Sequence, residues 1–159
     1  MSHAIRFAGP DDAAIIHELI VALAVYEKEP DAVEATPSSL EAQLRATPAP
    51  FECLLLEDGG EVCGLALFFH NYSTWRGKRG LYLEDLFVLP DLRGRGVGRE
   101  LLACLARLAL ERDCGRLEWS VLDWNEPAIR FYQRLGAEAM DGWTVNRVTG
   151  APLAALAAH

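Results

Sequence analysis

A glycine-rich segment near the middle of the chain restricts its fold more than any other feature. The segment Arg93-Gly94-Arg95-Gly96-Val97-Gly98 follows an apolar, strand-like run over Leu81–Leu89 and precedes apolar residues at helical spacing. Glycines let the backbone turn tightly and approach a ligand closely, and a helix start offers unpaired N–H groups to an anion. The pattern predicts a strand–turn–helix unit that suits a pyrophosphate, with a glycine-rich turn that binds no ligand as the alternative.

The spacing of these glycines excludes two common phosphate-binding motifs. The dinucleotide-binding motif requires GxGxxG directly after the first strand and an acid about 20 residues further on. Here the loop follows several elements and has the spacing R-G-x-G-x-G. A P-loop is excluded as well, because the GK[ST] ending is missing.

Strand and helix periodicities alternate along the rest of the chain. Strands are predicted over 3–8, 51–56, 62–69, 81–89 and 116–122, with weaker ones near 137–140 and 143–148. Helices are predicted to about Tyr26, over 37–47, after the glycine-rich segment, and over 125–135, where Gly136 is the expected stop. Residues 28–36 and 71–80 are predicted to be loops. The order β-α-α-β-β-β-α-β-α-β predicts a mixed α/β, or α+β, domain.

Length and charge narrow the class of protein. With 159 residues, 51% of them apolar, the chain is expected to form one domain over 1–150, followed by an Ala-rich tail over 151–159. The net charge of −8 argues against a nucleic-acid partner. The apolar runs fall short of the ~20 residues that cross a bilayer, and the N-terminus shows no signal-peptide pattern. We therefore expect a soluble, cytoplasmic protein with no membrane partner.

The spacing of cysteines and histidines gives no sign of a metal site. The histidines are scattered, and the cysteines lack CxxC spacing and lie in or beside apolar runs. We expect no bound metal, and free thiols at Cys53, Cys63, Cys104 and Cys114.

Two adjacent carboxylates, Glu84 and Asp85, lie inside the apolar run before the glycine-rich segment. Burying carboxylates without partners is costly, and on a regular strand these two would point to opposite faces. At least one should therefore reach a cleft, where a carboxylate can bind an ammonium ion and accept its proton. Pairing with a Lys or Arg of the same protein is the alternative. Acidic residues also predominate before residue 60 and arginines between 93 and 116, as in a protein that holds a cation on one side and an anion on the other.

Several segments together resemble the GNAT N-acetyltransferase superfamily. RGRGVG after an acid-bearing strand, followed by NEPAIRFYQRLGA over Asn125–Ala137, carries this resemblance. The segments LAVYE, WRGK, YLEDLFV and DWNEPAIRFY are similar to the spermidine/spermine (diamine) acetyltransferases, which include members acting on thialysine. The resemblance extends from the first helix to about Trp143. It implies a GNAT-like fold, with a central mixed, largely antiparallel sheet whose middle strands splay apart between flanking helices.

The resemblance also implies that acetyl-CoA is the cosubstrate and lies between the splayed strands. The backbone of Leu86, Phe87 and Val88 would pair with its pantetheine arm. Asn125, which is also a candidate helix cap, and Ala128 would contact CoA. The pyrophosphate would lie on the loop formed by Arg93, Gly94, Arg95, Gly96, Val97, Gly98 and Arg99.

The same resemblance assigns roles at the acceptor side. Glu84 would take the proton of the ammonium, directly or through water, and Asp85 would anchor the substrate. Tyr132 would protonate the CoA thiolate as it leaves, because a phenol is a suitable proton donor. Tyr26 and Glu27, at the end of the first helix, would form a cation-binding rim. Trp75 would line either the amine channel or a dimer interface.

These features predict an acetyl-CoA-dependent N-acetyltransferase that acts on a small polyamine-like or lysine-like primary amine by direct attack in a ternary complex. The resemblance also suggests a homodimer. A peptide or protein amine, or an aminoglycoside, is the alternative acceptor. A non-catalytic acyl-CoA-binding module is the alternative from another class, but the presence of Glu84 and Tyr132 argues against it, because binding CoA requires neither.

Overall fold

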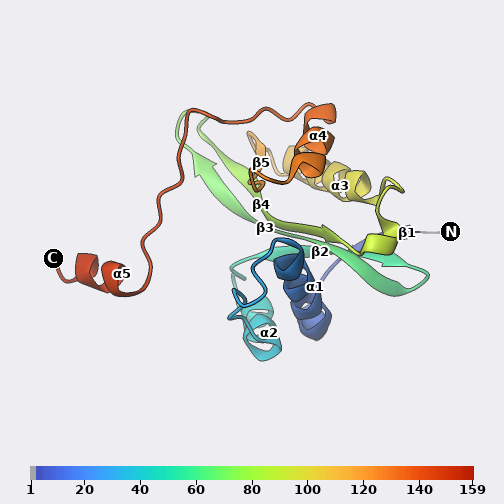
Figure 1. The fold of residues 1–159 in the computed structure, drawn as a ribbon, viewed down its shortest axis with the longest axis horizontal. Helices are drawn as coiled ribbons and strands as arrows, with labels where there is room; N and C mark the ends of the chain where they lie inside the picture. Colours follow the sequence, from blue (N-terminus) through green and yellow to red (C-terminus); the bar gives the residue numbers. More distant parts are fainter. Residues whose placement is uncertain (1–2) are drawn as a thin grey trace. The chain divides into compact units, whose positions relative to one another are not determined.

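A mixed β-sheet is the largest element of the chain before Leu122 (Figure 1). The structure, a computed structural model, describes residues 3–159. Within them the sheet has five strands in chain order, of which the first four pair antiparallel and the last runs parallel to the fourth. This confirms the predicted mixed, largely antiparallel sheet. The strands are β1 (His3–Phe7), β2 (Glu52–Asp58), β3 (Glu61–Ser73), β4 (Lys78–Val88) and β5 (Leu117–Trp119).

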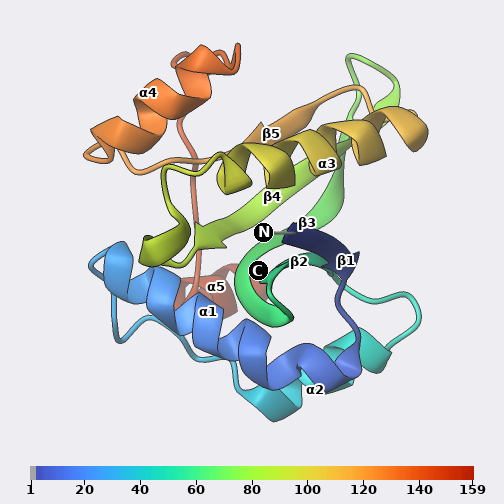
Figure 2. The same cartoon turned by 90° about the vertical axis from the view of Figure 1, so that its right-hand side faces the viewer.

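The chain divides into two compact units, one that ends at Leu122 and one over Asp123–His159. In the first unit, helices cover both faces of the sheet: α1 (Ala13–Tyr26) and α2 (Pro37–Arg45) lie against one face, and α3 (Val97–Glu111) against the other (Figure 2). Helix α3 provides the long crossover that parallel neighbours such as β4 and β5 require.

Local sequence determines where these helices begin and end. Pro37 occupies the first turn of α2, and the Thr36 hydroxyl accepts a hydrogen bond from the Ser39 N–H at 3.1 Å. Helix α1 ends at Tyr26, and Lys28 then adopts a φ of 64°, which directs the chain out of the helix.

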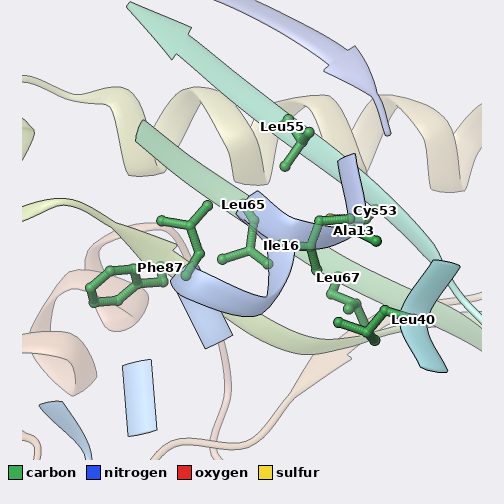
Figure 3. Packing of buried hydrophobic residues seen from close by; sticks show 9 residues of the cluster. Ala13, Ile16, Leu40, Cys53, Leu55, Leu65, Leu67 and Phe87 are labelled. Carbon is green, nitrogen blue, oxygen red and sulfur yellow. The ribbon is translucent and has the colours of Figure 1, made fainter. Parts of the chain in front are cut away.

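Alternate residues of the central strands point to opposite faces of the sheet. Leu65 and Leu67 of β3 lie in a cluster with Ile16 of α1 (Figure 3). Phe68 points to the other face, where the Arg112 guanidinium lies 5.9 Å from the centre of its ring. The α1 side of the sheet is therefore the face that carries Leu67, and the α3 side is the face that carries Phe68.

Two predicted boundaries in the sheet are wrong. The predicted loop over 71–80 belongs mostly to a hairpin, because Asn71 pairs with Gly80 and Ser73 pairs with Lys78. Polar side chains do not prevent this pairing, since the backbone makes the hydrogen bonds of the ladder. The strand predicted over 116–122 contains only Leu117–Trp119 within the described chain.

The second unit contains α4 (Glu126–Arg134) and α5 (Gly150–Ala157). Gly136, with a φ of 91°, follows α4 and confirms the predicted stop. The weak strands predicted near 137–140 and 143–148 are wrong, because neither segment pairs with a strand anywhere in residues 3–159. Helix α5 occupies most of the predicted tail. None of the helices in the described part of the chain is both long and apolar enough to cross a membrane.

Candidate active site

The glycine-rich loop connects β4 to α3, as the sequence predicts. Gly94 and Gly96 have φ angles of 80° and 81°, in the left-handed region that favours glycine. A Cβ atom added at either position would meet nothing within 4 Å, so the loop borders open space. Helix α3 begins directly after Gly96, and no side chain among residues 3–159 caps its first N–H groups. The start of this 15-residue helix therefore fits a phosphate-bearing ligand.

The arginines of this loop differ in their surroundings. Arg95 and Arg99 are exposed and carry their charge beside the start of α3. The Nε of Arg93 instead donates a hydrogen bond to the Val88 carbonyl at 3.0 Å. Its guanidinium lies 4.9 Å from the centre of the Tyr26 ring and 5.2 Å from that of Phe87. These cation–π contacts hold Arg93 between the end of α1 and the end of β4. The sequence did not indicate this position of Arg93.

The second half of β4 has one edge without a neighbouring strand. In the described chain β5 pairs with Leu81–Leu83 and extends no further, whereas β3 continues beside β4 to Val88. Phe87 and Val88 have buried side chains, so a ligand would reach them through the backbone. This open edge fits the predicted main-chain contacts of Leu86–Val88 with a pantetheine arm. Val97 is also buried, so its side chain belongs to the core.

A β-bulge interrupts β4 at Glu84. Leu83 pairs with Phe68 and Asp85 pairs with the adjacent Leu67, so Glu84 is an extra residue without a partner on β3. The prediction that Glu84 and Asp85 point to opposite faces is wrong, because it assumed a regular strand. Leu83 shares the α3 side with Phe68, whereas Glu84 acts electrostatically on Glu27 at the end of α1. Asp85 shares the α1 side with Leu67, and both carboxylates therefore lie on the side of α1.

Three carboxylates act on one another electrostatically where α1 ends beside β4. Burial, followed by the charges of Glu84 and then Glu27, raises the pKa of Asp85 to about 6. Burial and the charge of Glu84 also raise the pKa of Glu27, which directly follows α1. Among the described residues, no ion pair includes any of the three carboxylates. We call Glu27, Glu84 and Asp85 the acidic site. It attracts cations because it contains negative charge without an ionic partner.

The remaining predicted residues lie in the second unit. Asn125 occupies the position before α4 and is buried, but its side chain does not cap the helix. Ala128 and Tyr132 of α4 are half-buried, and the Tyr132 ring lies 5.5 Å from that of Phe131. The first unit therefore brings together Tyr26, Glu27, Glu84 and Asp85. In the second unit, Asn125 precedes α4, and Ala128 and Tyr132 lie within that helix.

Comparison with known proteins identifies the family. A model described as the acetyltransferase (GNAT) family matches residues 15–137, which is more than half of the chain. The chain belongs to this family. It is therefore an N-acetyltransferase, and the family implies acetyl-CoA as the acetyl donor. The glycine-rich loop and the open edge of β4 fit that molecule.

Similar proteins support the more specific resemblance. The chain is 37% identical to a thialysine N-epsilon-acetyltransferase from Bos taurus, over 96% of each chain. It is 32% identical to the L-ornithine N5-acetyltransferase NATA1 of Arabidopsis thaliana, over 96% of this chain and 86% of the relative. Among solved structures, an integron cassette protein from V. cholerae has a TM-score of 0.82 at 25% identity, covering 99% of this chain and 98% of its own.

Proposed function

We propose that the protein transfers the acetyl group of acetyl-CoA to a primary amine of a small polyamine-like or lysine-like molecule, by direct attack without a covalent enzyme intermediate. The observation that carries this proposal is the acidic site, in which Glu27, Glu84 and Asp85 lack ionic partners within the described chain. A small molecule with two amino groups supplies the positive charge that this site lacks.

The names of the relatives favour the same kind of acceptor. Thialysine and ornithine, named in two of them, are small molecules with a side-chain amine. Identity of 32–37% over nearly the whole chain supports a similar acceptor here. Because Glu27 directly follows α1 and Glu84 lies on β4, the acidic site can meet two cationic groups of one molecule from different parts of the chain.

Acetyl-CoA supplies an activated acetyl thioester when it is bound. In the first unit, the backbone from Gly94 to Gly98 and the side chains of Arg95 and Arg99 would hold its phosphates. The open edge of β4 at Leu86–Val88 would hold its pantetheine arm. A carboxylate of the acidic site takes the proton of the acceptor ammonium, which frees the nitrogen lone pair. Tyr132, matched through the FY pair of α4, gives its phenolic proton to the departing sulfur.

The test is a measurement of thiol release from acetyl-CoA with a panel of amines. The panel contains ornithine, lysine, thialysine, 1,4-diaminobutane, butylamine, an aminoglycoside and a lysine-containing peptide. The proposal predicts the highest kcat/KM with the small acceptors that carry two amino groups. A higher kcat/KM with the peptide or aminoglycoside would contradict the proposed acceptor class. Binding of acetyl-CoA without thiol release with any amine would contradict the catalytic function.

A further inference from the structure

We propose that three polar residues on the α1 side of the sheet bind the α-amino and α-carboxylate groups of a basic amino acid that serves as the acceptor. They are Asn71 of β3, Arg116, which directly precedes β5, and Glu118 of β5. We call these three residues the polar subsite. The inference rests on the proposed function and narrows it to acceptors with a zwitterionic group at the end remote from the reacting amine.

The side chains of the polar subsite contact one another. The Arg116 Nε lies 2.8 Å from Glu118 Oε1, and the Asn71 Nδ2 donates a hydrogen bond to the same oxygen at 3.4 Å. Gly80 pairs with Asn71, and a Cβ atom added at Gly80 would collide with Asn71 Oδ1. The same Cβ atom would lie 3.3 Å from Arg116 Cγ. The missing side chain at Gly80 therefore leaves the space that Asn71 and Arg116 occupy.

The polar subsite has an unused hydrogen-bond acceptor and is open to solvent. Asn71 Oδ1 is buried and accepts no hydrogen bond within the described chain. A buried acceptor without a donor costs free energy, so this oxygen favours a ligand that brings an N–H group. The side chains of Arg116 and Glu118 are 35% and 33% exposed, so a ligand can reach their ion pair.

The charges of the polar subsite match a zwitterion. Arg116 and Glu118 contribute one positive and one negative charge, so a lone ammonium or a lone carboxylate would face a like charge there. The end of an α-amino acid brings both signs. Its carboxylate would bind the Arg116 guanidinium, and its ammonium would bind Glu118 and Asn71 Oδ1.

Two aromatic rings lie between the acidic site and the polar subsite. Residues 67, 69 and 71 of β3 share the α1 side, because alternate residues of a strand point to the same face. Tyr82 pairs with Phe69 in β3 and with Glu118 in β5, and the rings of Phe69 and Tyr82 lie 5.2 Å apart. Both residues are half-buried, so their rings offer an apolar surface to the methylene groups of an acceptor. Three successive pairs of β3 with β4 lead from one site to the other: Leu67–Asp85, Phe69–Tyr82 and Asn71–Gly80.

The spacing of the two sites fits a small basic amino acid. Tyr82 and Asp85 are three positions apart in β4, which corresponds to at most about 10 Å at a rise of about 3.3 Å per residue. An extended ornithine or lysine measures about 7–9 Å from its carboxylate to its side-chain nitrogen. Its side-chain amine can therefore occupy the acidic site while its α-amino and α-carboxylate groups reach the polar subsite. A diamine has no carboxylate, and its second ammonium is expected at Glu27.

Matched acceptors test the proposal in the wild type. Ornithine, its methyl ester and 1,4-diaminobutane present the same kind of side-chain amine, but only ornithine has a carboxylate. Thiol release from acetyl-CoA should give a kcat/KM for ornithine about 5–30-fold above the values for the other two, because they lose a partly exposed, charge-assisted contact. An equal or higher kcat/KM with the methyl ester or the diamine would overturn the proposal. No thiol release with any amine would contradict the proposed function instead.

The variant Arg116→Gln removes the cation of the polar subsite, and Arg112→Gln is its matched control. Arg112 forms a partly exposed ion pair as well, 2.6 Å from Glu52, but it follows α3 on the other face of the sheet. Arg116→Gln should reduce the ratio of kcat/KM for ornithine to that for its methyl ester to about one. Arg112→Gln should keep the wild-type ratio, and Arg116→Lys, which retains the charge, should restore part of it.

Two results with the variants would overturn the assignment: a wild-type ratio in Arg116→Gln, or an equal fall of the ratio in Arg112→Gln. Calorimetric affinity for acetyl-CoA serves as the folding control. If Arg116→Gln fails that control, Glu118→Gln replaces it. This variant should lower kcat/KM for ornithine, which has an α-ammonium, more than for butylamine, which has none. Equal losses with the two acceptors would contradict the proposal.

Discussion

The side chain of Asp85 combines burial with two acidic neighbours, Glu84 and Glu27, and this affects stability as well as chemistry. A carboxyl whose pKa is higher in the folded than in the unfolded protein binds more protons when folded. The pKa rises here from an ordinary 3.8 to about 6. The contribution of Asp85 to stability therefore decreases as the pH rises from about 4 to about 6.

Asp85→Asn should consequently stabilise the fold while it impairs turnover. The variant should resist denaturant more strongly than the wild type at pH 8, by about 1–3 kcal/mol, because two pKa units correspond to roughly 3 kcal/mol. Below pH 4 the difference should vanish, since Asp85 is then protonated in both the folded and unfolded states. Urea unfolding at pH 4, 6 and 8 measures this. A stability difference that stays constant or shrinks as the pH rises would contradict the raised pKa.

The second prediction at the level of single residues concerns Tyr132. Replacing it with Phe removes one hydroxyl and keeps the ring that lies beside Phe131. If the phenol protonates the departing sulfur, kcat should fall by about 10²-fold while the affinity for acetyl-CoA stays the same. Initial rates at neutral pH and calorimetry measure the two quantities. An unchanged kcat would remove Tyr132 from the mechanism.

Residue types were readable from the sequence, but their orientation in the site was not. The carboxylates of Glu84 and Asp85 stood out because they interrupt an apolar run. Their common face depends on the bulge, which arises from how β3 and β4 align and leaves no mark in either strand's own sequence. The position of Arg93 over two aromatic rings depends in the same way on contacts between segments far apart in the chain.

At the scale of elements, periodicity predicted helices α1 to α4 but not α5, and it predicted the ends of strands poorly. Helices α1 to α4 have apolar faces and recognisable caps or stops, which are local signals. A strand instead extends as far as a partner pairs with it. This is why β3 and β4 continue through a polar stretch, and why the alternating residues near 143–148 form no strand in the described chain.

The loop between β4 and α3 can be tested with a matched pair of glycine variants. Gly96→Val should weaken acetyl-CoA binding at least tenfold, about 1.4 kcal/mol, because a side chain would enter the open space over the start of α3. Gly60→Val is the control, since Gly60 also has a positive φ, 88°, and open space around its Cβ, but lies in the β2–β3 turn.

Both glycine variants should lose stability, because valine is strained at a positive φ. Calorimetry should then find weaker acetyl-CoA binding only in Gly96→Val. Similar affinities in the two variants would mean that the phosphates of acetyl-CoA bind elsewhere.

At the scale of the whole molecule, charge is distributed according to the two kinds of ligand. The net charge is −8, yet the loop before α3 is rich in arginine, and the acidic site contains Glu27, Glu84 and Asp85. Such a distribution steers a polyphosphate and a polycation to different surfaces. Glu27 is the member of the acidic site expected to meet the second amino group of a diamine acceptor.

The kinetics of Glu27→Gln with a matched diamine and monoamine test this account most directly. Initial rates of thiol release with 1,4-diaminobutane and butylamine give both KM values, and Glu29→Gln, in the exposed loop after α1, controls for loss of any nearby charge. We predict that Glu27→Gln raises KM for the diamine about 2–5-fold, because a partly exposed ion pair contributes up to about 1 kcal/mol, and leaves KM for the monoamine unchanged. The effect should diminish at high salt. An equal rise for both amines, or no rise for either, would contradict the account of how this enzyme recognises its acceptor.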